Sequence, residues 1–235
     1  MIEQTFAAFT GAFFAFIFIC IGDMLTRLHE YQKRGYNALV ELEYYFNENM
    51  NTISDNIFVI DDFKDTIEKP LRNNEPAVYG NKLYQISFNN DILLRLNNLD
   101  LINKVFEFKT DVVKLNHSID FANGTYNEIK NAFTQHLINF QTYKINTLGL
   151  IEKLEELKKF LKKIQEKNVK LGAYVRVLER SKPLFTWVLH HMSLEKHYSE
   201  GLDRKVKEEL IKLEKERSDT MDKSQKEIEE THGRK

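Results

Sequence analysis

The sequence has few residues that interrupt helices and almost none that can cross-link a chain. It contains three prolines, nine glycines and one cysteine in 235 residues. So few breakers over this length favour long helices. Because Cys20 stands alone, an intrachain disulfide is excluded, and no spaced cysteine pair predicts a zinc site. The missing disulfide framework agrees with a cytosolic location for the soluble part.

An excess of charge of one sign is also missing. Charged residues make up 29% of the chain, yet the formal net charge is −1. Nucleic-acid-binding domains carry a basic patch or stripe, so this balance argues against a nucleic-acid partner. The sequence also lacks the glycine-rich phosphate loops and the hydrolase and zinc-protease motifs. We therefore expect no enzymatic activity, no cofactor and no small-molecule ligand.

One short segment gathers residue types that bind metals: His190, His191, Glu195 and His197. On a helix, His191 and Glu195 would share a face, but His190 and His197 would lie about 10 Å apart along the axis. That distance is too large for one metal ion unless the chain folds back at Gly201. We interpret these side chains as exposed polar residues and predict no metal site.

The N-terminus carries a long hydrophobic run. Residues 5–21 contain no charge, and the run extends to Leu25 if Asp23 lies among lipid headgroups. At about 1.5 Å per residue, residues 5–25 span roughly 30 Å, which matches the hydrocarbon core of a bilayer. A cleaved signal peptide is the alternative, but no basic residue precedes the run and the stretch ending at Gly22 is a poor cleavage site. We predict an uncleaved transmembrane anchor over residues 1–25.

The residues flanking this run predict its orientation. No lysine or arginine precedes it, whereas Arg27, Lys33 and Arg34 follow it. Basic residues are enriched on the cytoplasmic side of membrane helices. We therefore expect a single-pass integral membrane protein with its N-terminus outside and residues 26–235 in the cytoplasm.

Small residues recur within the anchor at Ala7, Gly11 and Ala15. A stripe of small residues at every fourth position lets two helix backbones approach closely in lipid. One interpretation is a contact face through which anchors associate. The other is that small residues are simply common in membrane helices, and the pattern does not decide between them.

The next part of the chain predicts a stalk helix over residues 26–67, because no proline occurs from Gly22 until Pro70. Apolar residues in it follow one another in steps of three and four, as in a coiled coil. They are Leu39, Leu42, Phe46, Met50, Ile53, Ile57 and Ile60. Prolines, asparagines and a glycine then predict an irregular connection over residues 68–90.

A helical bundle is expected over residues 91–192. Its first helix should begin near Asn89 or Asn90. That helix should end at Asn123-Gly124, since Thr125 and Glu128 form a capping box that typically opens a new helix. Six of its apolar residues should face the core: Leu94, Leu101, Ile102, Val105, Val112 and Ile119.

The clearest periodicity follows over about four heptads. Its positions are Leu150, Leu154, Leu157, Leu161, Ile164, Asn168, Leu171, Val175 and Leu178. This alternation of three and four predicts coiled-coil packing, either with another chain or with the stalk of the same chain. A lone asparagine at such a position can fix the register, so we favour that role for Asn168 over a solvent-facing one.

Two further segments complete the chain. Pro183 should end the long helix, and Leu184, Trp187 and Val188 then form a short apolar segment. It could lie on a membrane surface, although we favour a helix that caps the bundle. Residues 193–235 form a charged tail, expected to be helical or disordered.

The sequence thus predicts an all-α fold: one N-terminal transmembrane helix continuing into a long helical stalk, followed by a helical bundle with coiled-coil packing. For function we favour a membrane-anchored scaffold or protein-interaction protein that self-associates or binds a helical partner. The alternatives are a membrane-acting signalling or stress and defence effector, and an enzyme with an unrecognised site.

Overall fold

The computed structural model describes residues 2–180, 201–213 and 215, with side chains from residue 10 onward. This part of the chain is all-helical and contains no strand. It comprises the long helices α1 (Ile2–Arg72), α2 (Leu99–Thr134) and α3 (Phe140–Arg180), together with the short 3₁₀ helix η1 (Asn90–Arg95). The all-α prediction is confirmed.

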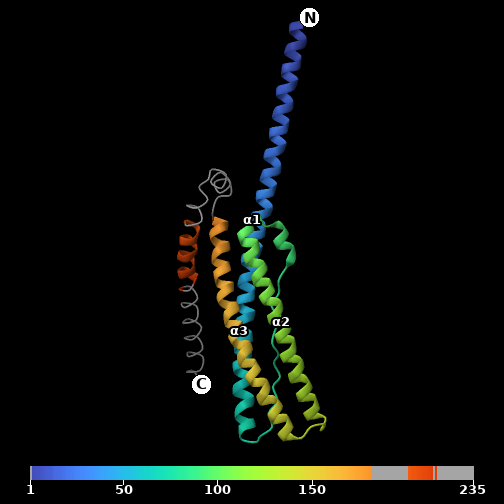
Figure 1. The fold of residues 1–235 in the computed structure, drawn as a ribbon, viewed down its shortest axis with the longest axis vertical. Coiled ribbons are helices and arrows are strands. Elements are labelled where there is room, and N and C mark those ends of the chain that lie inside the picture. The colour runs from blue at the N-terminus through green and yellow to red at the C-terminus, as the bar shows by residue number, and fades with distance from the viewer. Residues whose placement is uncertain (1, 181–200, 214, 216–235) are drawn as a thin grey trace, which may run out of the picture.

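The three long helices form an elongated bundle from which the first part of α1 projects alone (Figure 1). α1 runs down into the bundle, the connection after it returns to the upper end, and α2 then runs parallel to α1. α3 runs back in the opposite direction and packs against both of the others. The membrane-anchor prediction therefore falls on the one part of α1 that lies outside the bundle.

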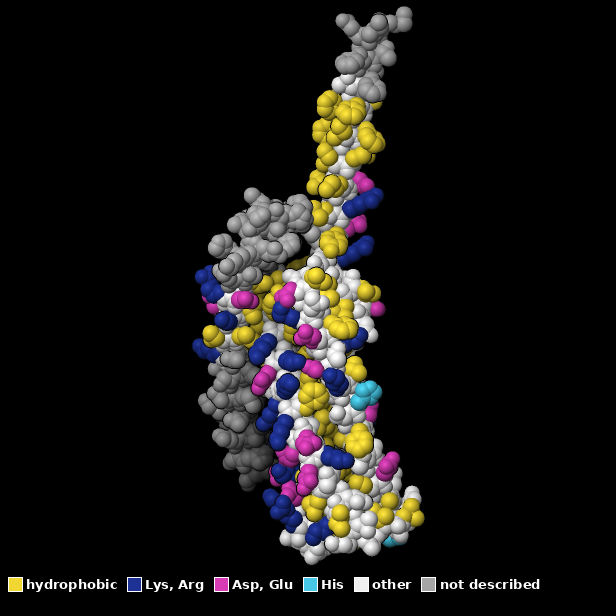
Figure 2. Space-filling view, in the orientation of Figure 1, with side chains coloured by type: hydrophobic (Ala, Val, Ile, Leu, Met, Phe, Trp, Pro, Cys, Tyr) yellow, Lys and Arg dark blue, Asp and Glu magenta, His cyan; other side chains and the backbone are white. Residues whose placement is uncertain are grey.

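One helix of the described chain is long and apolar enough to cross a membrane, and it is α1. None of its apolar window is buried against the rest of the protein. Figure 2 shows this stretch as a rod covered by hydrophobic side chains, with charged residues only at its junction with the bundle. Burial begins close to the bundle, where Gly35 and then Ala38 are enclosed.

The buried positions of each helix follow one another in alternating steps of three and four. In α2 the series is Leu101, Val105, Phe108, Val112, Leu115, Ile119, Ala122 and Tyr126. In α3 it includes all the predicted seam positions except Leu178, which is only partly buried. Such spacing turns one face of a straight helix toward the core, which is why three long helices can share a single continuous core.

The α1 series differs from the predicted one at three positions. Ala38 is buried in place of Leu39, which is only partly buried. Asn49 and Asn56 are buried, at 1% and 0% exposure, whereas Met50 and Ile57 are only partly buried. Apolarity alone favoured the methionine and the isoleucine. The structure places the asparagines inside, and Asn56 has a specific partner there, described below.

The predicted helix boundary at Asn123-Gly124 is wrong. α2 continues through these residues to Thr134, and α3 begins only at Phe140. The capping-box signal at Thr125 is overridden because Ile119, Ala122 and Tyr126 keep the core spacing across it. An exposed glycine inside a helix costs only about 1 kcal/mol, which this packing outweighs.

The turn at the start of η1 was predicted more closely. Asn89 caps η1, its side chain accepting a hydrogen bond from the backbone N–H of Asp91 at 3.0 Å. However, this short helix ends at Arg95, and α2 has a second cap at Asn98. Leu94 was expected to face the core but is 86% exposed, because the break after η1 takes it off the core-facing series.

Residues 201–213 are helical, and Leu202 and Val206 pack against the core. Glu209 is buried there and accepts a hydrogen bond from the Arg180 guanidinium at 2.7 Å. The charged tail was predicted to be helical or disordered, and residues 201–213 of it are helical. The segment of Leu184, Trp187 and Val188 and the region of His190 to His197 lie outside the described residues.

Candidate functional site

The connection between α1 and η1 is held along the bundle by asparagine side chains. The Asn56 amide on α1 donates to the carbonyl oxygen of Tyr84 and accepts from its N–H, both at 2.7 Å. A side-chain amide carries the same donor and acceptor pair as a peptide unit, so it can replace a neighbouring strand. The extended backbone at Tyr84 is thereby satisfied without a sheet.

Two asparagines on α2 repeat this arrangement from the other side. Asn116 exchanges a pair of hydrogen bonds with the backbone of Ile86, both at 2.9 Å. Asn123 does the same with Leu83, at 3.0 and 2.9 Å. Asn116 and Asn123 are one heptad apart and therefore lie on the same face of α2. We call these three asparagines, Asn56, Asn116 and Asn123, the asparagine clamp.

A cluster of tyrosines holds the beginning of the same connection. The N–H of Tyr79 donates to the Tyr126 hydroxyl at 2.6 Å, and the Tyr79 hydroxyl donates to the Asp62 carboxylate at 2.5 Å. The Tyr143 hydroxyl donates to the carbonyl oxygen of Ala77 at 2.5 Å, and its ring stacks on Phe133. These bonds tie all three long helices to one segment of irregular backbone.

Burial keeps these hydroxyls protonated. Desolvation raises the pKa of Tyr143 to about 12 and is also the main cause that raises the pKa of Tyr126. The pKa of Tyr79 is raised first by burial and then by its hydrogen bond to the Asp62 carboxylate. A catalytic tyrosine would need a lowered pKa to act as a base near neutrality. These tyrosines are therefore suited to donating hydrogen bonds.

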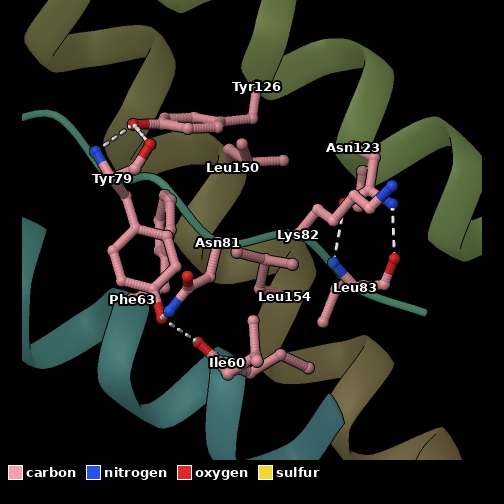
Figure 3. A pocket seen from close by; sticks show the side chains of 12 residues that line it. Ile60, Phe63, Tyr79, Asn81, Lys82, Leu83, Asn123, Tyr126, Leu150 and Leu154 are labelled. Carbon is pink, nitrogen blue, oxygen red and sulfur yellow. Dashed lines mark hydrogen bonds between the residues drawn. The ribbon is translucent and has the colours of Figure 1, made fainter.

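A small pocket opens beside the clamp (Figure 3). Its lining includes Phe63, Tyr79, Leu83, Asn123 and Tyr126, and its volume is about 30 Å³. That space holds about one water molecule. The dashed lines in Figure 3 include the bond from the Tyr79 N–H to the Tyr126 hydroxyl and the bond from the Leu83 N–H to Asn123. The pocket is about a tenth of the size of an ordinary small-molecule site, which is roughly 300–1,000 Å³.

Ion pairs connect the helices along their outer edges. The α1–α3 edge carries Lys64 with Glu155 at 2.8 Å and Arg176 with Glu43 at 2.6 Å. Glu179 on α3 lies near the second pair. Burial is the first cause that raises the pKa of Glu179, and its hydrogen bond with Glu43 is the second. Two carboxyl groups therefore share one site at the bundle end nearest the projecting helix.

The predicted register residue Asn168 is buried at 2% exposure. Its amide donates to the carbonyl oxygen of Phe46 on α1 at 2.6 Å, whereas its own oxygen has no hydrogen-bond partner among the described residues. Asn49 on α1 is also buried, and neither of its polar side-chain atoms has a partner in the described part of the chain. The partner of α3 at this position is thus the α1 helix of the same chain, and its role in setting register stays a prediction.

The predicted contact face of the anchor is only partly described. Gly11 and Ala15 are exposed, and a Cβ added at Gly11 would meet no atom within 4 Å. The side chain of Ala7 lies outside the described residues. No described part of the chain covers this face, and association between anchors stays a prediction.

The asparagine clamp was missed by the sequence reasoning. The stalk periodicity placed Ile57 at the buried position, so nothing in the local pattern indicated Asn56. No three histidine, cysteine, aspartate or glutamate side chains gather into a metal-binding group within the described ranges. No family model, curated protein or solved structure matches this chain.

Proposed function

We propose that this chain is a non-enzymatic scaffold or interaction protein, anchored in a membrane by residues 1–25 and self-associating or bound to a helical partner. The observation that carries the proposal is the apolar stretch of α1, none of which is buried against the rest of the described protein. The side chains of Phe14, Phe16 and Phe18 are 53%, 65% and 70% exposed. An apolar surface of this size marks a membrane or protein contact.

The contrast with the bundle supports a lipid environment for this stretch. The bundle buries its own apolar residues in one core, so α1 does not need its first residues for folding. A helix of about 20 apolar residues satisfies its own backbone and can cross the hydrocarbon core. The basic residues Arg27, Lys33 and Arg34 favour a cytoplasmic bundle and an external N-terminus.

The rest of the proposal concerns geometry. α1 continues from the apolar stretch into the bundle without a break, so it would hold the bundle at a set distance from the membrane. The alternation of three and four among buried residues supports coiled-coil packing within the bundle. A scaffold of this kind acts by binding partners on its surface and does not require a catalytic site.

The anchor is tested by expressing the full chain and determining its N-terminal mass after membrane extraction. An intact N-terminus that stays in the membrane through alkaline carbonate washing is the expected result. Reporter fusions at both termini then establish the orientation. A mature chain that has lost residues 1–22, or one released by carbonate, would overturn the proposal.

Self-association is tested by crosslinking in native membranes and by light scattering of the solubilised protein. Gly11→Ile should block close approach of two anchors. Cys20→Ile is the matched control, because position 20 lies about 180° from position 11 around the helix. We expect dimer yield to fall for the first variant and not for the second. A strictly monomeric chain that captures no partner would sink this part of the proposal.

A further inference from the structure

Two leucines at the corner between η1 and α2 are largely exposed. Leu94 is 86% exposed, the highest value among large apolar side chains in the described residues, and Leu99 is 72% exposed. A single exposed leucine is ordinary on a protein surface. Two exposed leucines at one corner of the fold are less common, and the position of this corner suggests what they contact.

The corner lies at the end of the bundle from which the projecting part of α1 emerges (Figure 1). Asn97, between the two leucines in sequence, donates from its side chain to the carbonyl oxygen of Tyr31 at 3.2 Å. Asn97 also packs so closely on Gly35 that a Cβ there would lie 2.3 Å from its amide nitrogen. The corner is therefore fixed at the level of residues 31–35 of α1.

This level is close to the expected membrane surface. At about 1.5 Å per residue, residues 31–35 lie roughly 9–15 Å beyond Leu25, where the apolar run ends. The headgroup layer adds about 5–8 Å outside the hydrocarbon core on each side. Membrane helices tilt by about 20° on average, and by up to about 40°. A tilt toward the corner brings it down to the headgroups.

Leu99 and the facing stretch of α1 are placed to make such a contact. Leu99 is the first residue of α2, and Cβ atoms in a helix point toward its N-terminus, which here is the end nearest the anchor. Tyr31 is 57% exposed on the facing stretch of α1, and Lys33 follows it with an exposed side chain. Tyrosine favours the membrane interface, and lysine favours anionic headgroups.

We propose that the Leu94–Leu99 corner rests on the lipid headgroup layer of the membrane that holds α1. The bundle then touches the bilayer at a second point, and this contact selects one direction of tilt for the whole rod. The proposal builds on the membrane anchor proposed above and adds a second contact that the anchor alone does not require.

The experiment uses the full chain in vesicles of phosphatidylcholine and phosphatidylglycerol. In a Cys20→Ser background, single cysteines at Leu94, Leu99 and Leu137 carry an environment-sensitive fluorophore. Leu137 is the matched control, because it is 73% exposed but lies at the opposite end of the bundle, in the turn before α3. Lipids with a headgroup nitroxide quench labels that reach the surface. We expect strong quenching at 94 and 99 and none at 137.

A second pair of variants separates apolar contact from simple proximity. With the label at 94, Leu99→Glu should abolish the quenching, whereas Leu137→Glu should leave it unchanged. A label at the native Cys20, in a separate sample with acyl-chain nitroxide lipids, reports on the anchor. Quenching at Cys20 with equal quenching at 94 and 137 would overturn the lipid contact and leave the anchor intact. No quenching at Cys20 would overturn the anchor itself.

Discussion

Replacing Asn56 tests whether the asparagine clamp stabilises the fold through hydrogen bonds. Asn56 is fully buried and makes two 2.7 Å bonds with the Tyr84 peptide groups. Asn56→Leu keeps the branching and the number of side-chain heavy atoms but removes the hydrogen-bond partners of both the N–H and the carbonyl oxygen of Tyr84. Each bond contributes about 0.5–1.5 kcal/mol net, and each peptide group left unsatisfied costs about 1–3 kcal/mol. For the two backbone groups of Tyr84 this gives a total loss of about 2–6 kcal/mol.

Asn56→Asp refines the test because its protonation state changes its hydrogen bonding. An ionised carboxylate accepts from the Tyr84 N–H but cannot donate to its carbonyl oxygen, whereas a protonated carboxyl does both. Burial and the facing carbonyl should raise the pKa of the introduced carboxyl in the folded state. The stabilising contribution is then full below the unfolded value of about 3.9 and is lost as pH rises through the folded value.

The assay is urea unfolding of the full chain in detergent, followed by circular dichroism at pH 7 and at acidic pH. We expect Asn56→Asp to be strongly destabilised at pH 7 and to approach the parent protein in acid, while Asn56→Leu stays destabilised at both. Asn51→Asp is the control, since Asn51 is exposed on the same helix. If the gap between Asn56→Asp and the parent protein is the same at both pH values, the hydrogen-bond reasoning is refuted.

Three further changes test other parts of the fold. Glu179→Gln should raise the unfolding midpoint at pH 7, because burial and Glu43 raise the pKa of Glu179 and its ionised form opposes folding; no gain at pH 7, or an equal gain in acid, would contradict this. Raising the pH above 10 should destabilise the parent protein by up to about 2 kcal/mol through Tyr143, whose pKa of about 12 exceeds its unfolded value, and Tyr143→Phe should flatten that part of the stability profile. Gly149→Ala, with no atom nearby, should gain up to about 1 kcal/mol in urea unfolding from helix propensity, whereas Gly35→Ala should lose most of that gain, because its methyl group displaces Asn97 from the bond to Tyr31.

The helices were predictable where one local pattern decides the structure. In α3, nine residues keep one spacing over four heptads, and eight of them are buried. The absence of proline between Gly22 and Pro70 likewise predicted an unbroken α1, although the helix passes Pro70 and ends at Arg72. In these stretches local propensity and core packing favour the same structure.

The predicted end of α2 at Asn123-Gly124 was wrong because two local signals compete there. Gly124 and the capping box at Thr125 favour a break, while the spacing of Ile119, Ala122 and Tyr126 favours continuation. Tertiary packing decides such a conflict, and the packing partners of these residues lie far away in the sequence. Tyr126, for example, packs its ring against Phe63 and bonds to the backbone of Tyr79.

The asparagine clamp could not be predicted from the sequence for a related reason. Asn56, Asn116 and Asn123 bind peptide groups 28, 30 and 40 residues away. The sequence does not show which backbone groups an asparagine will bind, and most asparagines in folded proteins are exposed. The same limit hid the Leu94 corner, where an apolar residue assigned to the core faces outward.

A continuous series of contacts links the asparagine clamp, the Leu94–Leu99 corner and the part of α1 next to the proposed anchor. The clamp fixes the connection along α1 and α2, and the connection leads directly into η1 and the corner. The corner in turn contacts α1 at Tyr31, where the helix has left the bundle core but has not reached the apolar stretch. α1 is therefore supported on the N-terminal side of Ala38 as well as within the core, which opposes bending at the junction. If residues 1–25 cross a membrane as proposed, a helix supported in this way would transmit a change in their tilt or association to the bundle as a rigid movement.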